Sequence, residues 1–414
     1  MNVQQDRLWE RLMSLGTIGR HPDGSGGVTR MSFTREERHA KDKVASYMRE
    51  AGLAVREDAV GNLIGRLEGR DPGAPVLLVG SHVDSVPNGG DFDGPLGVLS
   101  AVEALQTIGE KNIKLTSPVE VVAFTDEEGA RFHFGMIGSR GVAGTLKKTD
   151  LLNVDHNGIS IEQAMKDYGL DPDQFKAVAR SPEGVKAYLE VHIEQGKVLE
   201  SLDHSVGIVS GMAGILWLKF ILTGEAGHAG STPMTFRKDP LVAASAIIQA
   251  IEEEAAKRPR TVGTVGQLGL QPGGVNIIPG KVEFTLDLRD VDEPTRDEVE
   301  KAILSRAEQI CKEREVHLHV EVLQRIAPVV CDEHLQTVMT DVFTEMGLEP
   351  TKVVSGAGHD GMQFKALCPV GMIFARSKNG ISHHPDEYTS PEDCALSAEV
   401  LFQTILRVAE VNKD

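Results

Sequence analysis

Cysteine, positive charge and long apolar runs are all scarce in this chain of 414 residues. The four cysteines are scattered and form no CxxC pair, so they predict reduced core thiols and not a disulfide framework or a zinc knuckle. No apolar run approaches the length that spans a membrane, and the amphipathic N-terminal segment lacks the apolar centre of a signal peptide. We therefore expect a cytoplasmic protein without a membrane partner.

Acidic residues outnumber basic ones by 61 to 43, which gives a formal net charge of −18. This charge repels nucleic acid and anionic membranes, so a small molecule is the expected partner. Apolar residues make up 41% of the chain, and its length is enough for a large core and for two or three domains.

Short apolar runs alternate with amphipathic segments in the first half of the chain. The runs 62–67, 76–80 and 119–125 are typical of buried strands, and helices are predicted at 34–51 and 94–109. This alternation predicts an α/β fold built on one sheet.

The pattern changes from about Gly214 onwards. The segment 216–223 alternates apolar and polar side chains, as in a sheet that is covered on one face only. The other elements predicted in this part are a helix at 239–257, strands at 261–270 and 281–290, a helix at 295–314 and a strand at 316–322. The simplest organisation is one catalytic domain, formed by residues 1–213 and 329–414, that is interrupted by an inserted α+β two-layer domain at 214–328.

Chemistry-bearing side chains follow three of the predicted strands. His82 and Asp84 come after the run 76–80 and project to one side if the strand continues, so Asp84 can accept a hydrogen bond from one ring nitrogen of His82 while the other binds a metal. Asp93 lies at the start of the next helix, near the sheet edge where α/β proteins bind ligands. These positions make the stretch from residue 81 to residue 94 the centre of the predicted site.

Two more strands end in polar groups. Glu127 and Glu128 end the run 119–125, where neighbouring carboxylates point in different directions, so that one can hold a metal while the other faces substrate. Taken alone, such a pair is more often a solvated acidic corner. His192 lies in a strand that begins near residue 187, and a buried structural histidine is an equally good interpretation of it.

Nitrogen and oxygen donors without a thiolate suit Zn²⁺, Mn²⁺, Co²⁺ or Ni²⁺. The candidates are His82, Asp93, Glu127, Glu128, His192 and one of His383 or His384. Three histidines and one glutamate that share a bridging aspartate are enough for two ions roughly 3.5–4 Å apart. Glu127 is then the spare carboxylate that can move a proton.

Eight segments of the sequence resemble the M20 metallopeptidase family, in its amidase and hydantoinase branch. In chain order they are GSHVDSVPNGGDFDGPLGV, FTDEEGARF, LEVHIEQG, GHAGSTPM, GGVNIIPG, LDLRDVD, SGAGHDGM and ISHHPDEYT. The resemblance spans nearly the whole chain. It implies an aminopeptidase-like catalytic domain with a central mixed sheet and two metal ions, and a smaller inserted domain that serves as a lid and forms a homodimer.

The resemblance also implies a role for each motif residue. His82 and His192 become ligands of different metals, Asp93 the bridging ligand, Glu128 a further ligand and Glu127 the general base. The family places its last ligand four residues before a glutamate, and counting back from Glu387 selects His383 over His384.

For substrate binding, the resemblance implies that His228 stabilises the oxyanion and that Asn276 and Arg289 hold a substrate carboxylate. A planar guanidinium suits that task, although Arg289 can equally pair with Asp287 or Asp290. Gln195 matches a position beside the scissile group, and Gly358 and His359 belong to a loop expected to line the pocket.

Leu216 and Trp217 bear on the choice of substrate within this branch. Allantoate hydrolases carry a Gln-Arg pair at this place, whereas an apolar pair resembles the N-carbamoyl-L-amino-acid hydrolases. We therefore expect hydrolysis of N-carbamoyl-L-amino acids to the L-amino acid, carbon dioxide and ammonia. The alternatives are allantoate or β-ureidopropionate hydrolysis, ordinary amide or peptide cleavage on the same scaffold, and a metal-binding dimer without catalysis.

Overall fold

A nine-stranded mixed sheet forms the centre of the computed structural model, which describes residues 1–21 and 26–410. The strands run in the order β1-β2-β4-β3-β5-β16-β6-β14, and β15 also pairs with β6. They are β1 (Ala54–Glu57), β2 (Leu63–Leu67), β3 (Val76–His82), β4 (Val119–Phe124), β5 (Val185–Ile193), β6 (Val206–Met212), β14 (Val329–Val330), β15 (Lys352–Ser355) and β16 (Val370–Ala375). The predicted α/β fold with a central mixed sheet is confirmed.

Four neighbouring strands of this sheet are parallel: β4, β3, β5 and β16. Nearly all of their side chains are buried, as expected for strands that are covered on both faces. Because the strands run in one direction, their carboxyl ends meet at one edge of the sheet. His82 pairs with Phe124, and His192 pairs with Phe374, close to that edge.

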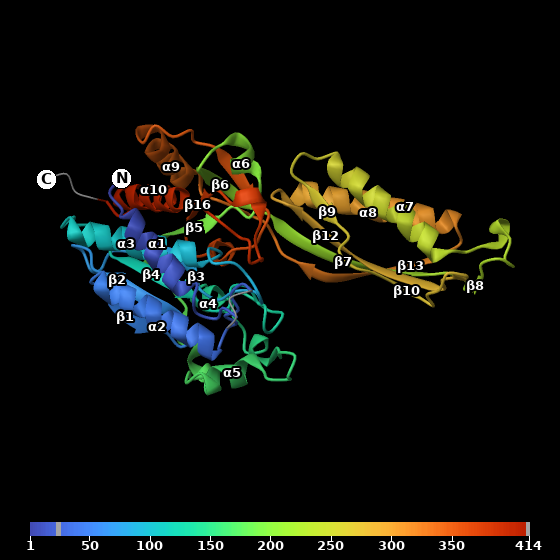
Figure 1. Cartoon of the computed structure of the whole chain (residues 1–414), viewed down its shortest axis with the longest axis horizontal. Coiled ribbons are helices and arrows are strands. Elements are labelled where there is room, and N and C mark those ends of the chain that lie inside the picture. The colour runs from blue at the N-terminus through green and yellow to red at the C-terminus, as the bar shows by residue number, and fades with distance from the viewer. Residues whose placement is uncertain (22–25, 411–414) are drawn as a thin grey trace. The chain divides into compact units, whose positions relative to one another are not determined.

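The long helices of this part gather on one face of the sheet. Helices α2, α3 and α10 pack on it, and α1 packs on α3 and α10, as Figure 1 shows. The helices of this part are α1 (Gln5–Leu15), α2 (Arg35–Glu50), α3 (Pro95–Glu110), α4 (Ile137–Val142), α5 (Ile161–Asp167), α6 (Val198–Leu202), α9 (Glu333–Glu345) and α10 (Pro391–Val408). The buried faces of α1, α2, α3, α9 and α10 form one large apolar core with the sheet, and α4 and α5 contribute to a smaller cluster.

Residues 211–330 form a second compact unit, and residues 1–210 with 331–414 form the first. The sheet of the second unit has the order β10-β12-β7-β13, with β9 also paired to β12. Its main elements are β7 (Gly214–Thr223), β8 (Gly227–His228), α7 (Pro240–Ala256), β9 (Val262–Thr264), β10 (Leu268–Gln271), β11 (Ile277–Ile278), β12 (Lys281–Asp290), α8 (Glu293–Glu313) and β13 (His317–Arg325). Every second residue of β12 is buried, so this sheet has one core face, and Phe220 stacks on Phe284 there.

One predicted strand is wrong. The segment 261–270 is not continuous, because β9 and β10 pair with different stretches of β12. Thr264 lies opposite Asp287 and Leu268 opposite Phe284, so four steps along one side match three along the other. The extra residue breaks the ladder at 265–267, as a bulge does.

The four cysteines are free thiols, and three of them are buried. Within the described ranges, no helix is both long enough and apolar enough to cross a membrane.

Candidate metal and catalytic site

The carboxylate of Asp93 is the meeting point of three imidazoles. Its Oδ1 lies 3.4 Å from Nε2 of His82 and 3.1 Å from Nε2 of His192, and its Oδ2 lies 3.1 Å from Nε2 of His383. Glu128 Oε2 lies 3.7 Å from the same nitrogen of His383. The structure thus brings together all five residues that the sequence nominated as metal ligands.

Two groups of potential ligand atoms share Asp93. One consists of His82, Asp93 and His192, the other of Asp93, Glu128 and His383, and within each the donor atoms lie within 4.8 Å of one another. His82 and His192 thus belong to the same group, on the same oxygen of Asp93, which contradicts the expectation that they are ligands of different metals. A carboxylate with one oxygen in each group is the arrangement that a bridging ligand requires.

The outer nitrogens of two of these rings are already engaged. Nδ1 of His82 lies 3.1 Å from the main-chain oxygen of Asp84, and Nδ1 of His192 lies 2.9 Å from that of Ile193. When Nδ1 donates to a carbonyl, Nε2 carries the free lone pair that a metal binds. Both rings are therefore oriented as metal ligands are.

Glycine at position 94 is required by this packing. Its φ is +82°, and a side-chain carbon there would lie about 2.5 Å from the His82 ring. Any other residue would push the imidazole away from Asp93.

Asp84 differs from its sequence-based role in one respect. Its carboxylate lies 3.7 Å from Nδ1 of His82, beyond hydrogen-bond distance, because β3 ends at His82 and the main-chain oxygen takes that contact. The two carboxylate oxygens instead accept the backbone N–H groups of Glu127 and Glu128 at 3.3 Å each. Asp84 therefore ties the β3 loop to the β4 loop.

The electrostatics of the cluster favour bound cations. Burial and the charge of Asp93 raise the pKa of Glu128 to about 7, and burial raises the pKa of Glu127 well above its ordinary value. Burial opposes ionisation of Asp93 too, but His192, His383 and His82 lower the pKa of this carboxyl well below its usual range. Buried acids that repel one another are stabilised when a divalent ion joins them.

Glu128 Oε1 is buried and has no hydrogen-bond partner among the described residues, which fits a carboxylate that is a metal ligand. Glu127 belongs to neither ligand group, although its Oε2 lies 3.8 Å from Nε2 of His82. Glu127 is thus a carboxylate, with its side chain 9% exposed, that lies beside the two groups and outside them.

His383 and His384 are clearly distinguished. His383 faces Asp93, whereas Nδ1 of His384 accepts the backbone N–H of Asp386. Only His383 belongs to a ligand group.

The remaining predicted residues of the first unit lie around this cluster. Gln195 donates from Nε2 to Asp93 Oδ2 at 2.7 Å. His359 is buried, with its ring 4.5 Å from that of His192 and its Nε2 2.7 Å from Ser355 Oγ, so it packs behind His192. Gly358 is half-buried, and a side-chain carbon there would lie 3.0 Å from Met136.

Sequence reasoning missed two residues here. Glu387 accepts the backbone N–H groups of Phe92 and Asp93, and Ser382 lies between Glu387 and Asp93. Glu387 served only as a spacing marker for His383. That spacing was the available signal, because an acidic residue close to a metal ligand often orients the ligand through hydrogen bonds.

The other predicted residues belong to the second unit. Nδ1 of His228 accepts the backbone N–H groups of Gly230 and Ser231, which leaves Nε2 as a donor. Asn276 is exposed, and its main-chain oxygen accepts the N–H of Ala229.

Arg289 pairs with Asp287 through Nε at 2.9 Å and Nη2 at 2.7 Å, which is the salt bridge that its sequence also allowed. Trp217 lies directly opposite Asp287 on β7 and is 39% exposed. Leu216 is fully buried opposite Leu288, in the core. Of the apolar pair, only Trp217 shares the face of the sheet that carries Arg289.

Two groups of metal-binding side chains that share one carboxylate are typical of metal-dependent hydrolases. The chain belongs to Peptidase family M20/M25/M40, whose model it matches over residues 78–407. The M20 family is metal-dependent, and the two ligand groups can hold metal ions. The predicted family membership is confirmed.

Individual relatives are similar over nearly their whole length. The chain is 58% identical over 408 residues to an N-carbamoyl-L-amino acid amidohydrolase of Geobacillus stearothermophilus, with 99% of each chain covered. It is 35% identical to a ureidoglycolate hydrolase of Arabidopsis thaliana, with 99% of this chain and 87% of the relative covered. A hydantoinase/carbamoylase family amidase from Burkholderia multivorans has a TM-score of 0.92 at 32% identity, with 98% of both chains covered.

Proposed function

We propose that this chain hydrolyses N-carbamoyl-L-amino acids to the L-amino acid, carbon dioxide and ammonia. The observation that carries the proposal is the Asp93 cluster, in which two ligand groups share one carboxylate while Glu127 lies beside them and outside both. Relatives at 58%, 42% and 38% identity are named as amidohydrolases of this substrate class, and those named for ureidoglycolate or allantoate are 35–36% identical.

The residues present fit two divalent ions. His82 and His192 would hold one ion together with Asp93, and Glu128 and His383 would hold the other, with Asp93 as the shared ligand. Mn²⁺, Co²⁺, Ni²⁺ and Zn²⁺ all accept nitrogen and oxygen donors of this kind. Such ions, when bound, polarise a carbonyl and lower the pKa of a water molecule.

The chain's own groups then move the protons. Glu127 takes a proton from the attacking water while the water oxygen bonds to the carbamoyl carbon. Glu127 then delivers this proton to the amino-acid nitrogen as the C–N bond breaks. The products of this step are the free amine and carbamic acid, which decomposes to carbon dioxide and ammonia. Burial keeps the pKa of Glu127 high, which helps its carboxylate to accept the proton.

Substrate binding is assigned to the second unit. Arg289 and Asn276 bind the substrate carboxylate, and Nε2–H of His228 donates to the carbonyl oxygen as negative charge develops there. Two hydrogen bonds at Nδ1 support that role for His228, since they hold the neutral ring with its proton on Nε2. We further propose that this unit is a lid that forms a homodimer, which light scattering would detect as twice the mass of one chain.

A substrate panel tests the proposed activity. Protein stripped by a chelator is reloaded with one ion at a time and supplied with N-carbamoyl-L-amino acids, their D-enantiomers, β-ureidopropionate, allantoate and ureidoglycolate, and ammonia and amino acid are measured. We expect turnover of the L-carbamoyl compounds only after reloading. No release with any ion, or faster release from one of the other compounds, would overturn the proposal.

A further inference from the structure

We propose that Glu387 and Ser382 orient two groups of the site, the Asp93 carboxylate and the Gln195 amide, and that both are positioning residues. The inference rests on the proposed function, because it takes Asp93 as a metal ligand and Gln195 as a substrate contact. It concerns how these two groups acquire their orientation.

Glu387 fixes the turn that carries Asp93. Its side chain is buried, and Oε1 accepts the backbone N–H groups of Phe92 at 2.9 Å and Asp93 at 3.0 Å. A side-chain carbon at Gly90 would lie 2.2 Å from this oxygen, so the carboxylate fills space that only glycine leaves open. Backbone bonds on both residues set the direction in which the Asp93 side chain leaves the chain.

Ser382 connects Glu387 to the site. Its hydroxyl lies 2.8 Å from Glu387 Oε2 and 3.1 Å from Asp93 Oδ2, and it accepts the Nε2–H of Gln195 at 3.1 Å. The hydroxyl has one proton, which goes to one of the two carboxylates. Whichever takes it, Ser382 Oγ presents a lone pair to Gln195.

This arrangement determines which way round the Gln195 amide lies. Asp93 Oδ2 at 2.7 Å and Ser382 Oγ at 3.1 Å accept hydrogen bonds, and Nε2 of His383 lies 3.4 Å away, so the NH₂ end must face these groups. The other end, Oε1, is buried and has no partner among the described residues. Asp93 and Ser382 therefore fix which end of the amide faces the metal ligands, and Oε1 is the acceptor that remains for a carbamoyl N–H donor.

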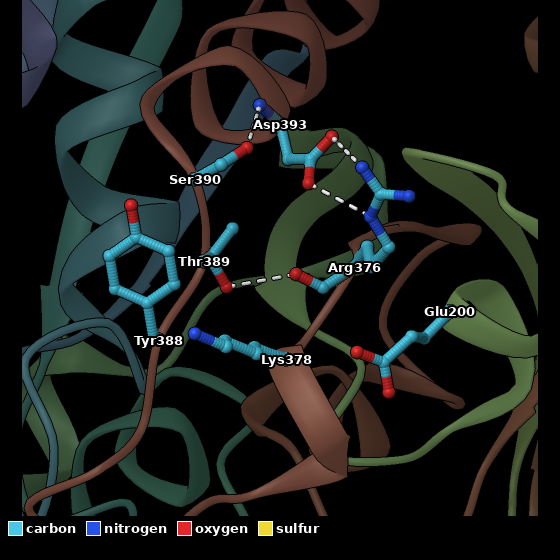
Figure 2. A pocket seen from close by; sticks show the side chains of 7 residues that line it. All are labelled: Glu200, Arg376, Lys378, Tyr388, Thr389, Ser390 and Asp393. Carbon is cyan, nitrogen blue, oxygen red and sulfur yellow. Dashed lines mark hydrogen bonds and ion pairs between the residues drawn. The ribbon is translucent and has the colours of Figure 1, made fainter.

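The loop that carries Ser382 and Glu387 is closed at its base by other contacts. The N–H of Lys378 donates to the oxygen of Tyr388 at 2.9 Å, and Thr389 Oγ1 donates to the oxygen of Arg376 at 3.0 Å. Figure 2 shows this base, where Asp393 binds the Arg376 guanidinium beside a cavity of about 210 Å³. Substitutions at Ser382 therefore change the tip of a loop whose base is held independently.

The test compares Ser382→Ala, Ser382→Thr and Glu387→Gln, with Thr389→Val as the matched control. Thr389→Val also removes one hydroxyl hydrogen bond from this loop but touches neither Asp93 nor Gln195. The readouts are the Mn²⁺ dissociation constant, from competition with a chelating dye, and kcat and KM for an N-carbamoyl-L-amino acid at saturating Mn²⁺.

We expect Ser382→Ala to weaken Mn²⁺ binding about 10- to 100-fold, as loss of a partner behind a metal ligand does, and to raise KM more than it lowers kcat. Ser382→Thr should restore both values. Glu387→Gln should weaken Mn²⁺ binding, because a neutral amide is a weaker acceptor than a carboxylate for the two backbone N–H groups that fix the turn of Asp93. Thr389→Val should leave both values within about twofold of wild type.

Unchanged Mn²⁺ affinity and KM in Ser382→Ala, or an equal loss in Thr389→Val, would overturn the inference. If the wild-type protein hydrolyses no carbamoyl compound, the proposed function fails by itself, and the Mn²⁺ affinities still test the orientation of Asp93.

Discussion

At the scale of single residues, the fold gives different surroundings to adjacent residues of the same type. Glu127 and Glu128 are adjacent, yet only Glu128 belongs to a ligand group. His383 and His384 are adjacent, yet only His383 faces Asp93. Backbone direction decides both cases, because neighbouring residues in a turn point to different sides, and His383 has a φ of +55°.

Glu127→Gln should retain metal and lose turnover. The amide keeps the size of the side chain but cannot accept the proton of water, so kcat should fall about 10²- to 10⁴-fold while metal content per chain stays at the wild-type level. Glu128→Gln is the control, and it should lose metal as well as activity. Equal metal loss in both variants would contradict the separate roles of the two glutamates.

Arg289→Lys should raise KM with a smaller effect on kcat. Lysine keeps the charge but not the planar fork, and loss of one charged hydrogen bond weakens binding about 10- to 100-fold. Arg325→Lys is a matched control in the same unit, because Arg325 also binds a carboxylate, that of Glu300, at 2.7 Å to each oxygen. A KM that responds equally to both changes would argue against a substrate contact at Arg289.

At the scale of elements, the site depends on strand ends and on the segments tied to them. Helix α10 follows the loop of Glu387 directly and also holds the start of the chain. Glu399 on α10 accepts the backbone N–H groups of Asn2 at 2.5 Å and Val3 at 3.0 Å. The first residues are thereby fixed to the core without a disulfide.

Glu399 should make stability depend on acid pH. Burial opposes its ionisation, but hydrogen bonds from Gln403, Asn2 and Val3 outweigh burial and lower the pKa of Glu399 below its ordinary value of 4.5. A carboxyl with a depressed folded-state pKa stabilises the protein above its unfolded pKa, and this contribution is lost as the pH falls through the folded-state value.

Glu399→Gln should therefore melt at a lower temperature than wild type at pH 6, and the gap should shrink as the pH falls below 4.5, measured by circular dichroism. Glu10→Gln, an exposed position on α1, should show no such pH-dependent gap. A Glu399→Gln gap that stays constant from pH 6 to pH 3 would contradict the assignment.

At the scale of the whole molecule, the candidate metal ligands and the proposed substrate-binding residues belong to different units. All five candidate metal ligands belong to residues 1–210 and 331–414, and the proposed carboxylate-binding residues belong to 211–330. The second unit has its own core, centred on Phe220 and Phe284. Metal binding should accordingly act on the stability of the first unit.

Mn²⁺ should raise the thermal midpoint of the chelator-treated protein. A ligand at a hundredfold its dissociation constant stabilises the folded state by about 2.7 kcal/mol. Differential scanning calorimetry should show the full upward shift in wild type and in His319→Ala, an exposed position on β13. The shift should be smaller in His192→Ala, measured against its own midpoint, because only the group of Asp93, Glu128 and His383 stays intact. A full shift in His192→Ala would contradict the metal role of His192.

The sequence alone determined the alternation of elements and the residues with metal-binding chemistry. The spacing of apolar residues and the local composition predict the elements, because strands that are buried on both faces must be apolar along their length. The same local rules failed at 265–267, where the break depends on how two strands share β12. Alternation along 216–223 puts Leu216 and Trp217 on opposite faces, but only the pairing of β7 with β12 shows that Trp217 shares its face with Arg289.

Only the tertiary structure decided which groups meet at Asp93. Residues 82, 93, 128, 192 and 383 are far apart in the chain. Parallel pairing of β3, β4, β5 and β16 brings the strands and loops that contain them to one edge of the sheet. The sequence marks Glu387 only by its spacing from His383 and does not mark Ser382 at all, because orienting a neighbour is a matter of distance and direction. A sequence specifies which donors and acceptors exist, and the fold specifies which of them face one another.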